Sequence, residues 1–147
     1  MSSTITLLRK DFYLFNINGN QLKQNISKAL EILGLENCEI TIIFISRNRM
    51  QNLKKAYLGI DELTDVLSFE SGEINPESGN QYLGDIAISP MKALKQARKK
   101  HINFNLEILT LCIHGLLHLV GYDHSSKSDE VKMFKQQDYI LGEICQI

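Results

Sequence analysis

The stretch that decides how this chain is organised reads His114-Gly115-Leu116-Leu117-His118-Leu119-Val120-Gly121-Tyr122-Asp123-His124. On an α-helix, the four-residue spacing of the first two histidines separates them by about 40° around the axis and one turn along it. Gly121 supplies a left-handed residue that can end the helix, and His124 can then swing back toward the other two. The spacing therefore predicts a metal site with three histidine ligands.

The histidines lie in a segment, from about Phe104 to Val120, whose apolar side chains point in nearly every direction. Such a segment is typical of a helix buried in the middle of a domain. Its few polar side chains fall within roughly 80° of one another, and they are Glu107, Thr110, His114 and His118. Cys112 points the other way and is not expected to be a ligand. A lone buried histidine is usually hydrogen-bonded in the core, but three at these spacings favour a metal ion.

Ligation by imidazole alone suits zinc and also nickel, copper or iron, and three ligands leave a position for water, as catalytic sites need. The nearest mechanistic pattern is H-E-x-x-H-x-x-G-x-x-H, the zinc site of the metzincin proteases. Gly115 stands where those enzymes have glutamate, the base that takes a proton from the attacking water. A metzincin-like peptidase is therefore only a minor alternative.

The composition predicts one globular domain, residues 1–147, because the chain has 147 residues and 44% hydrophobic content. Its longest apolar run, Leu111 to Val120, contains two histidines and is too short to span a bilayer. The N-terminus has no basic-then-apolar leader. The three cysteines are far apart, as expected of reduced thiols. We therefore expect a cytoplasmic protein without a membrane partner.

The charges are unevenly distributed, although the net charge is only −1. Seven acids and no Lys or Arg lie between Ala56 and Met91, whereas the segment from Pro90 to Lys100 carries bases and no acid. Four bases there, three or four residues apart or adjacent, form a basic stripe that could contact phosphates: Lys92, Lys95, Arg98 and Lys99. The ordinary alternative for such a run is a solvated helix face.

Sequence patterns predict strands over 4–8, 39–45, 66–69 and 83–88. Helices are predicted from Asn20 to Gly34, from Ser46 to Gly59 with Met50, Leu53 and Tyr57 inward, from Ser89-Pro90 to about Lys100, over 104–120, and over 129–141 after Ser128.

The histidine stretch resembles the signature of the bacterial YbeY family, single-strand-specific metallo-endoribonucleases of ribosomal RNA maturation and quality control. Thr64-Asp65-Val66-Leu67-Ser68-Phe69 is similar to the family's T-D-V-L-S-F element, and Gly84-Asp85-Ile86-Ala87-Ile88-Ser89 to its G-D-I-x-I-S element. The order and separations also agree. The resemblance covers the chain from about Tyr57 to its end.

The resemblance implies an α+β fold in which a small mixed sheet of about four strands is flanked by helices. It implies that His114, His118 and His124 bind one zinc ion, with water in the fourth position, and that the strands of the two elements line the cleft that faces the metal. Partners would be single-stranded RNA, chiefly ribosomal RNA, and components of the small ribosomal subunit. Asp85 would be a base, or a contact for an RNA end or a protein partner, or an ordinary strand-end aspartate.

The chain departs from the family just before the first strand element. The family usually has Tyr-Arg-Gly there, with an arginine that helps catalysis, whereas this chain has Tyr57-Leu58-Gly59. Either another cation of the preceding helix takes the arginine's place (Arg47, Arg49, Lys54 or Lys55), or activity is weakened, or the role has shifted. Two hypotheses follow: a zinc-dependent endoribonuclease, and a metal-stabilised RNA-binding or ribosome-assembly factor with little catalysis.

Overall fold

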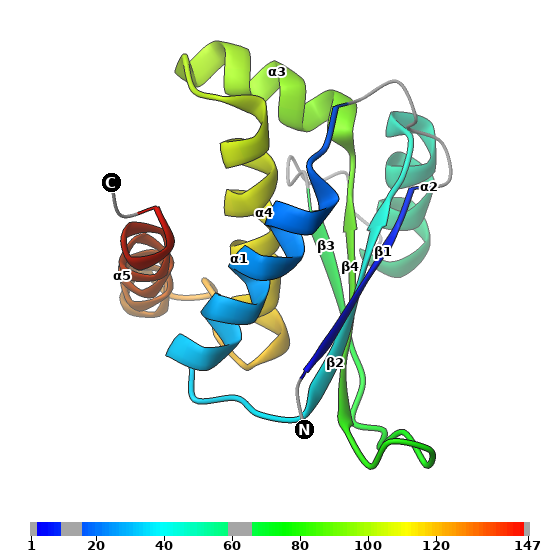
Figure 1. The fold of residues 1–147 in the computed structure, drawn as a ribbon. Helices are drawn as coiled ribbons and strands as arrows, with labels where there is room; N and C mark the ends of the chain where they lie inside the picture. The colour runs from blue at the N-terminus through cyan, green and yellow to red at the C-terminus, as the bar shows by residue number, and fades with distance from the viewer. Residues whose placement is uncertain (1–2, 10–15, 59–65, 146–147) are drawn as a thin grey trace.

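The computed structural model describes residues 3–9, 16–58 and 66–145. Its elements follow in the order β1 (Thr4–Leu8), α1 (Gly19–Ile32), β2 (Cys38–Phe44), α2 (Arg47–Leu58), β3 (Val66–Glu70), β4 (Gln81–Ile88), α3 (Pro90–Lys100), α4 (Phe104–Leu119) and α5 (Lys127–Ile144). The strands form one sheet in the order β1-β2-β4-β3 (Figure 1). β1, β2 and β4 run parallel, and β3 is antiparallel to β4. The expected α+β fold with a small mixed sheet is thus confirmed.

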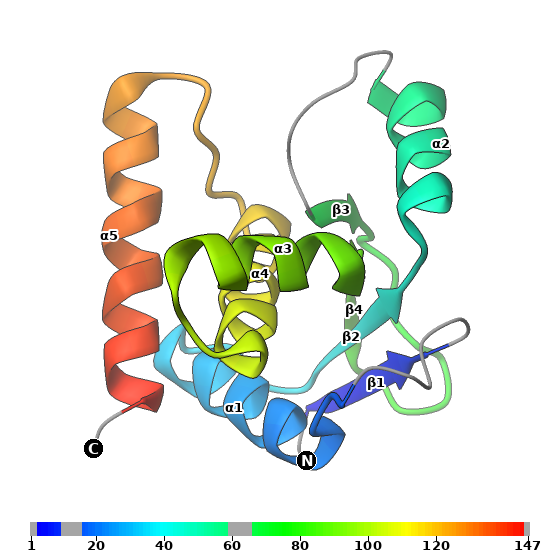
Figure 2. The same cartoon turned by 90° about the horizontal axis from the view of Figure 1, so that it is seen from above.

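The two faces of the sheet are covered unequally. Figures 1 and 2 show α1 and α4 on one face, with α5 beyond α4 and α3 across its start, and α2 on the other face. Alternate side chains of β2 therefore enter different layers. Ile42 and Phe44 join the main core under α1 and α4. Met50 of α2 packs in a smaller cluster with Leu67 and Ala87 on the opposite face.

Helix α4 is the central buried helix, as its all-round apolar surface predicted. It contacts β3, β4, α1, α3 and α5. The helix packs tightly against the sheet at Gly115, where an added Cβ would lie 2.8 Å from Ile86 Cγ2 and 3.1 Å from Ser68 Oγ. Ser68 Oγ also donates a 2.8 Å hydrogen bond to the carbonyl of Gly115. A larger residue here would push the helix and its histidines away from β3.

Two helices begin earlier than predicted, because a different side chain satisfies the free N–H groups of the first turn. Asn18, not Asn20, caps α1 by accepting a hydrogen bond from Gln21 N, and Ser126, not Ser128, caps α5. Tyr57 was expected on the inner face of α2 but is 68% exposed. The predicted end of α2 at Gly59 lies outside the described residues.

No single helix in residues 3–9, 16–58 and 66–145 is long and apolar enough to cross a membrane. Helices α3 and α4 reach that length and apolarity only as a pair, which is bent by 114° at its break.

Candidate metal centre

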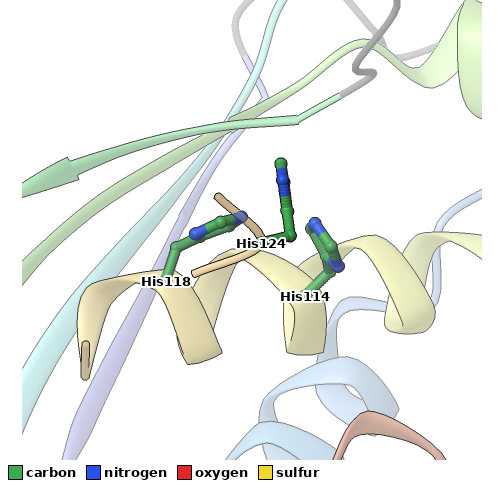
Figure 3. A group of neighbouring side chains, drawn as sticks. All are labelled: His114, His118 and His124. Carbon is green, nitrogen blue, oxygen red and sulfur yellow. The ribbon is translucent and has the colours of Figure 1, made fainter. Parts of the chain in front are cut away.

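Three imidazole rings converge where α4 ends. His114 and His118 project from its last two turns, and after Leu119 the chain turns through Gly121, whose φ of 103° favours glycine. The loop then brings His124 back over the other two rings (Figure 3). One ligand nitrogen from each ring lies within 4.8 Å of the other two. The structure thus brings together the three residues that the sequence predicted to meet.

The rings of His114 and His118 are held by hydrogen bonds through their Nδ1 atoms. His114 Nδ1 lies 2.8 Å from Oε1 of Gln137, a buried residue of α5, and His118 Nδ1 lies 3.1 Å from the carbonyl oxygen of Tyr122. A carbonyl oxygen can only accept, so the proton resides on Nδ1 in each ring. Each Nε2 then carries a lone pair and is the atom available to a metal ion.

The surroundings also favour the neutral form of both rings. Burial is the main cause that lowers the pKa of His114 from 6.5, and the charges of His118 and His124 lower it further, while the hydrogen bond to Gln137 acts in the opposite direction. Burial likewise lowers the pKa of His118, and the charge of His124 adds to the effect. At neutral pH both imidazoles are therefore in the neutral form with one ring proton, as metal ligation requires.

The donor set fits a single transition-metal ion. Zinc binds imidazole nitrogens at about 2.0–2.1 Å in a tetrahedral arrangement, which places two ligand nitrogens about 3.4 Å apart. The ligand nitrogens of the three rings lie within 4.8 Å of one another, which is close to this value. Among the described residues no other group of three or more His, Cys, Asp or Glu gathers in this way. The cluster can therefore hold one ion through three histidines.

The structure explains why the peptidase pattern is broken at Gly115. The glycine lies against Val66, Ser68 and Ile86, with no space for even a methyl group. A glutamate cannot occupy this position, so the base that metzincin chemistry requires cannot be added there without moving α4.

Gln137 is the residue of the site that sequence reasoning missed. It lies on the buried face of α5 between Met133 and Ile140. An uncharged polar residue inside an apolar stripe indicates that its side chain has a buried hydrogen-bond partner. The sequence could not show that this partner is His114, which is 23 residues away.

The other candidate residues do not meet at the histidines. Asp85 pairs with Thr41 in the sheet, and its side chain points to the α2 face, whereas its neighbours Gly84 and Ile86 face α4. Its Oδ1 accepts a hydrogen bond from the Tyr82 hydroxyl.

Both strand elements turn only alternate residues toward α4, the helix that carries His114 and His118. In β3, Val66 and Ser68 face α4, whereas Leu67 and Phe69 face α2. Thr64, Asp65 and the side chain of Leu58 lie outside the described residues.

The basic stripe of α3 (Lys92, Lys95, Arg98 and Lys99) lies beside the start of α4 (Figure 2). The histidines project from the last two turns of α4, whereas α3 crosses its first turns.

Comparison with known proteins gives a consistent result. A family described as "Endoribonuclease YbeY" matches residues 10–145 of this chain. A protein of that name from Persephonella marina is 37% identical over 139 residues, which is 94% of this chain and 91% of the relative. Another from Macrococcus caseolyticus is 44% identical over 111 residues, 73% of this chain and 72% of the relative.

A solved structure agrees with the fold. The solution structure of a protein from Thermotoga maritima matches with a TM-score of 0.62 and 27% identity, over 95% of this chain and 88% of that one. The family match covers nearly the whole chain and includes all three converging histidines. The chain therefore belongs to the YbeY family of endoribonucleases.

Proposed function

We propose that this protein is a zinc-dependent endoribonuclease that cleaves single-stranded RNA in ribosomal RNA processing and ribosome quality control. The observation that carries the proposal is the convergence of three imidazoles, two of them with Nδ1 hydrogen-bonded so that Nε2 is available. The relatives that cover most of the chain bear the name endoribonuclease, which supports RNA as the substrate. In this proposal the polar side chains of His114 and His118 on α4 therefore bind the metal ion and do not only pack in the core.

In this proposal His114, His118 and His124 hold one zinc ion, and water occupies the remaining position. The bound ion would supply Lewis-acid activation of water and of a phosphoryl oxygen. The protein's own residues do the rest. Gln137 and the Tyr122 carbonyl fix the orientation of two rings, and Phe134, whose ring centroid lies 5.8 Å from that of His114, shields one side.

Proton transfer must come from a group other than a helix glutamate, because Gly115 has no room for one. Asp85 as a base at the metal is not supported by its place on the far face of the sheet. The basic stripe of α3 would bind phosphates of the RNA backbone. Substrates that extend onto α3 should therefore be cut best.

The test compares two exposed histidines, so that neither variant disturbs the core. His124→Asn removes a proposed ligand, whereas His101→Asn, at a left-handed helix cap that asparagine tolerates, removes the remaining histidine. Cleavage of single-stranded RNA by zinc-loaded protein should fall by at least about 100-fold in His124→Asn and stay unchanged in His101→Asn. If His124→Asn or chelator-treated protein cuts as well as the parent, the proposal is wrong.

A second function, an RNA-binding or ribosome-assembly factor with little catalysis, is favoured by Leu58 in the family's arginine position. Leu58→Arg separates the two. A large gain in cleavage at unchanged RNA affinity supports a weakened nuclease. No cleavage by either form, with RNA binding intact, supports the assembly factor.

The wider setting belongs to the same proposal. We take residues 1–147 to act as one domain, which the continuous core under α1 and α4 supports. We place the protein in the cytoplasm with ribosomal RNA and small-subunit components as partners, and the free thiols of Cys38, Cys112 and Cys145 suit that compartment.

A further inference from the structure

A pocket of about 450 Å³ lies between α2 and the sheet, on the face opposite the histidine cluster. Its walls are mostly aliphatic, and they include Ile43, Leu53 and Ala87. This volume lies within the usual range for pockets that bind small ligands, about 300–1,000 Å³. The metal chemistry proposed above makes no use of this pocket.

An aromatic pair forms one side of the pocket. The rings of Tyr57 and Phe69 meet edge to face with centroids 5.4 Å apart, and both residues line the pocket. Tyr57 nevertheless stays 68% exposed. Proteins that bind single-stranded RNA stack its bases on exposed aromatic rings, and Tyr57 offers such a ring.

Two charges of opposite sign complete the lining. Arg49 comes from α2, which carries four bases and no acid, and so favours a phosphate group. Asp85 comes from β4. Tyr82 donates to its Oδ1, and among the described residues none donates to its Oδ2. A carboxylate oxygen accepts from base amino and imino groups or from ribose hydroxyls. A nucleotide offers both a phosphate and such donors.

We propose that this pocket is a nucleobase subsite for the single-stranded RNA that the histidine cluster would cleave, with Tyr57 as the stacking surface, Asp85 as the acceptor and Arg49 beside the phosphate. The proposal rests on the proposed function. Edge strand β3 separates the two sites. Phe69 lines the pocket, and the preceding residue, Ser68, bonds the carbonyl of Gly115 next to His114. In this proposal one strand of RNA would cross the edge strand β3 from the pocket to the histidine cluster.

The test measures binding without cleavage. Fluorescence anisotropy in excess chelator gives the Kd of a labelled single-stranded RNA octamer of mixed sequence and of the same octamer with every base removed. Tyr57→Ala should weaken binding of the normal octamer by roughly 5- to 150-fold. Tyr139→Ala, which removes a similarly exposed tyrosine from α5, should not change it. The abasic octamer should bind all three proteins alike.

The outcomes separate this proposal from the proposed function. If Tyr57→Ala binds the normal octamer as tightly as the parent, or weakens both octamers equally, the subsite does not exist, whether or not the parent cleaves RNA. If Tyr57→Ala weakens only the normal octamer, the subsite stands even if zinc-loaded protein proves inactive. Arg49→Gln should reduce the slope of log K against log salt by about 0.7, because the variant neutralises one phosphate fewer; an unchanged slope removes Arg49 from the site.

Discussion

Gln137→Leu is the substitution that tests most directly how the histidine cluster is held. Leucine suits the site sterically, because position 137 is buried between Met133 and Ile140. The change removes the acceptor that lies 2.8 Å from His114 Nδ1 and leaves everything else in place. Metal affinity should therefore fall without loss of the fold.

The magnitude follows from the burial of the bond. A buried donor left without a partner costs about 1–3 kcal/mol. The imidazole of His114 is only partly buried, so water can replace the amide in part, and we expect the lower half of that range. A loss of about 1–2 kcal/mol corresponds to a zinc affinity that is roughly 5- to 30-fold weaker. This overlaps the lower part of the range, about 10- to 100-fold, that is found when hydrogen-bond partners of metal ligands are removed.

The assay is competition for zinc between the protein and a chromophoric chelator at pH 7.5. Gln137→Glu should keep the parent affinity or exceed it, because a carboxylate accepts the same hydrogen bond more strongly. Gln136→Leu is the matched control, since its side chain makes no hydrogen bond within the described residues. Thermal unfolding in chelator shows whether each variant is folded. An affinity for Gln137→Leu within twofold of the parent would refute the assigned role.

Three further predictions concern packing, pH and RNA contact. Gly115→Ala should be less stable in urea unfolding than Gly142→Ala by about 1–3 kcal/mol, because a Cβ at Gly115 clashes with the sheet whereas one at Gly142 meets nothing within 4 Å. The folded-state pKa values of His114 and His118 lie below 6.5, so the unfolded chain binds more protons than the folded chain near that pH. The unfolding free energy of metal-free protein should therefore fall as pH drops below about 6.5. A double variant without both histidines should lose this dependence of the unfolding free energy on pH. Replacing the four bases of the α3 stripe with glutamine should reduce the slope of log K against log salt for RNA binding. The reduction should be about 0.7 for each phosphate that the stripe neutralises in the parent. An unchanged slope in anisotropy titrations would show that the stripe is only a solvated helix face.

Helix ends were predicted correctly where the residues at that end carry an unambiguous start or stop signal. The pair Ser89-Pro90 begins α3 as expected, and Gly34 follows the end of α1 with φ of 73°. The errors arose where two capping residues stood close together, as with Asn18 and Asn20, because the choice depends on which side chain reaches the free N–H group. Tyr57 was misplaced because helical spacing cannot tell whether a neighbour covers that face.

The convergence of the histidines could be predicted from short-range spacing. The four-residue interval puts His114 and His118 on one face of α4, and Gly121 lets the following loop return His124 to them. The absence of a metzincin-type glutamate base could also be read directly from the sequence, because residue 115 is glycine. Helix geometry converts the interval between the first two histidines into a distance in space, and the turn at Gly121 does the same for His124.

Only the tertiary structure decided which residues share a site. It placed Gln137 against His114 across 23 residues, and it turned Asp85 toward α2 although Ile86, next to it, faces α4. In a strand, one step along the chain changes the face of the sheet, so strand order and the helix that covers each face determine the neighbours of a side chain. Strand order and the helix that covers each face depend on packing between distant segments, which no local sequence pattern specifies.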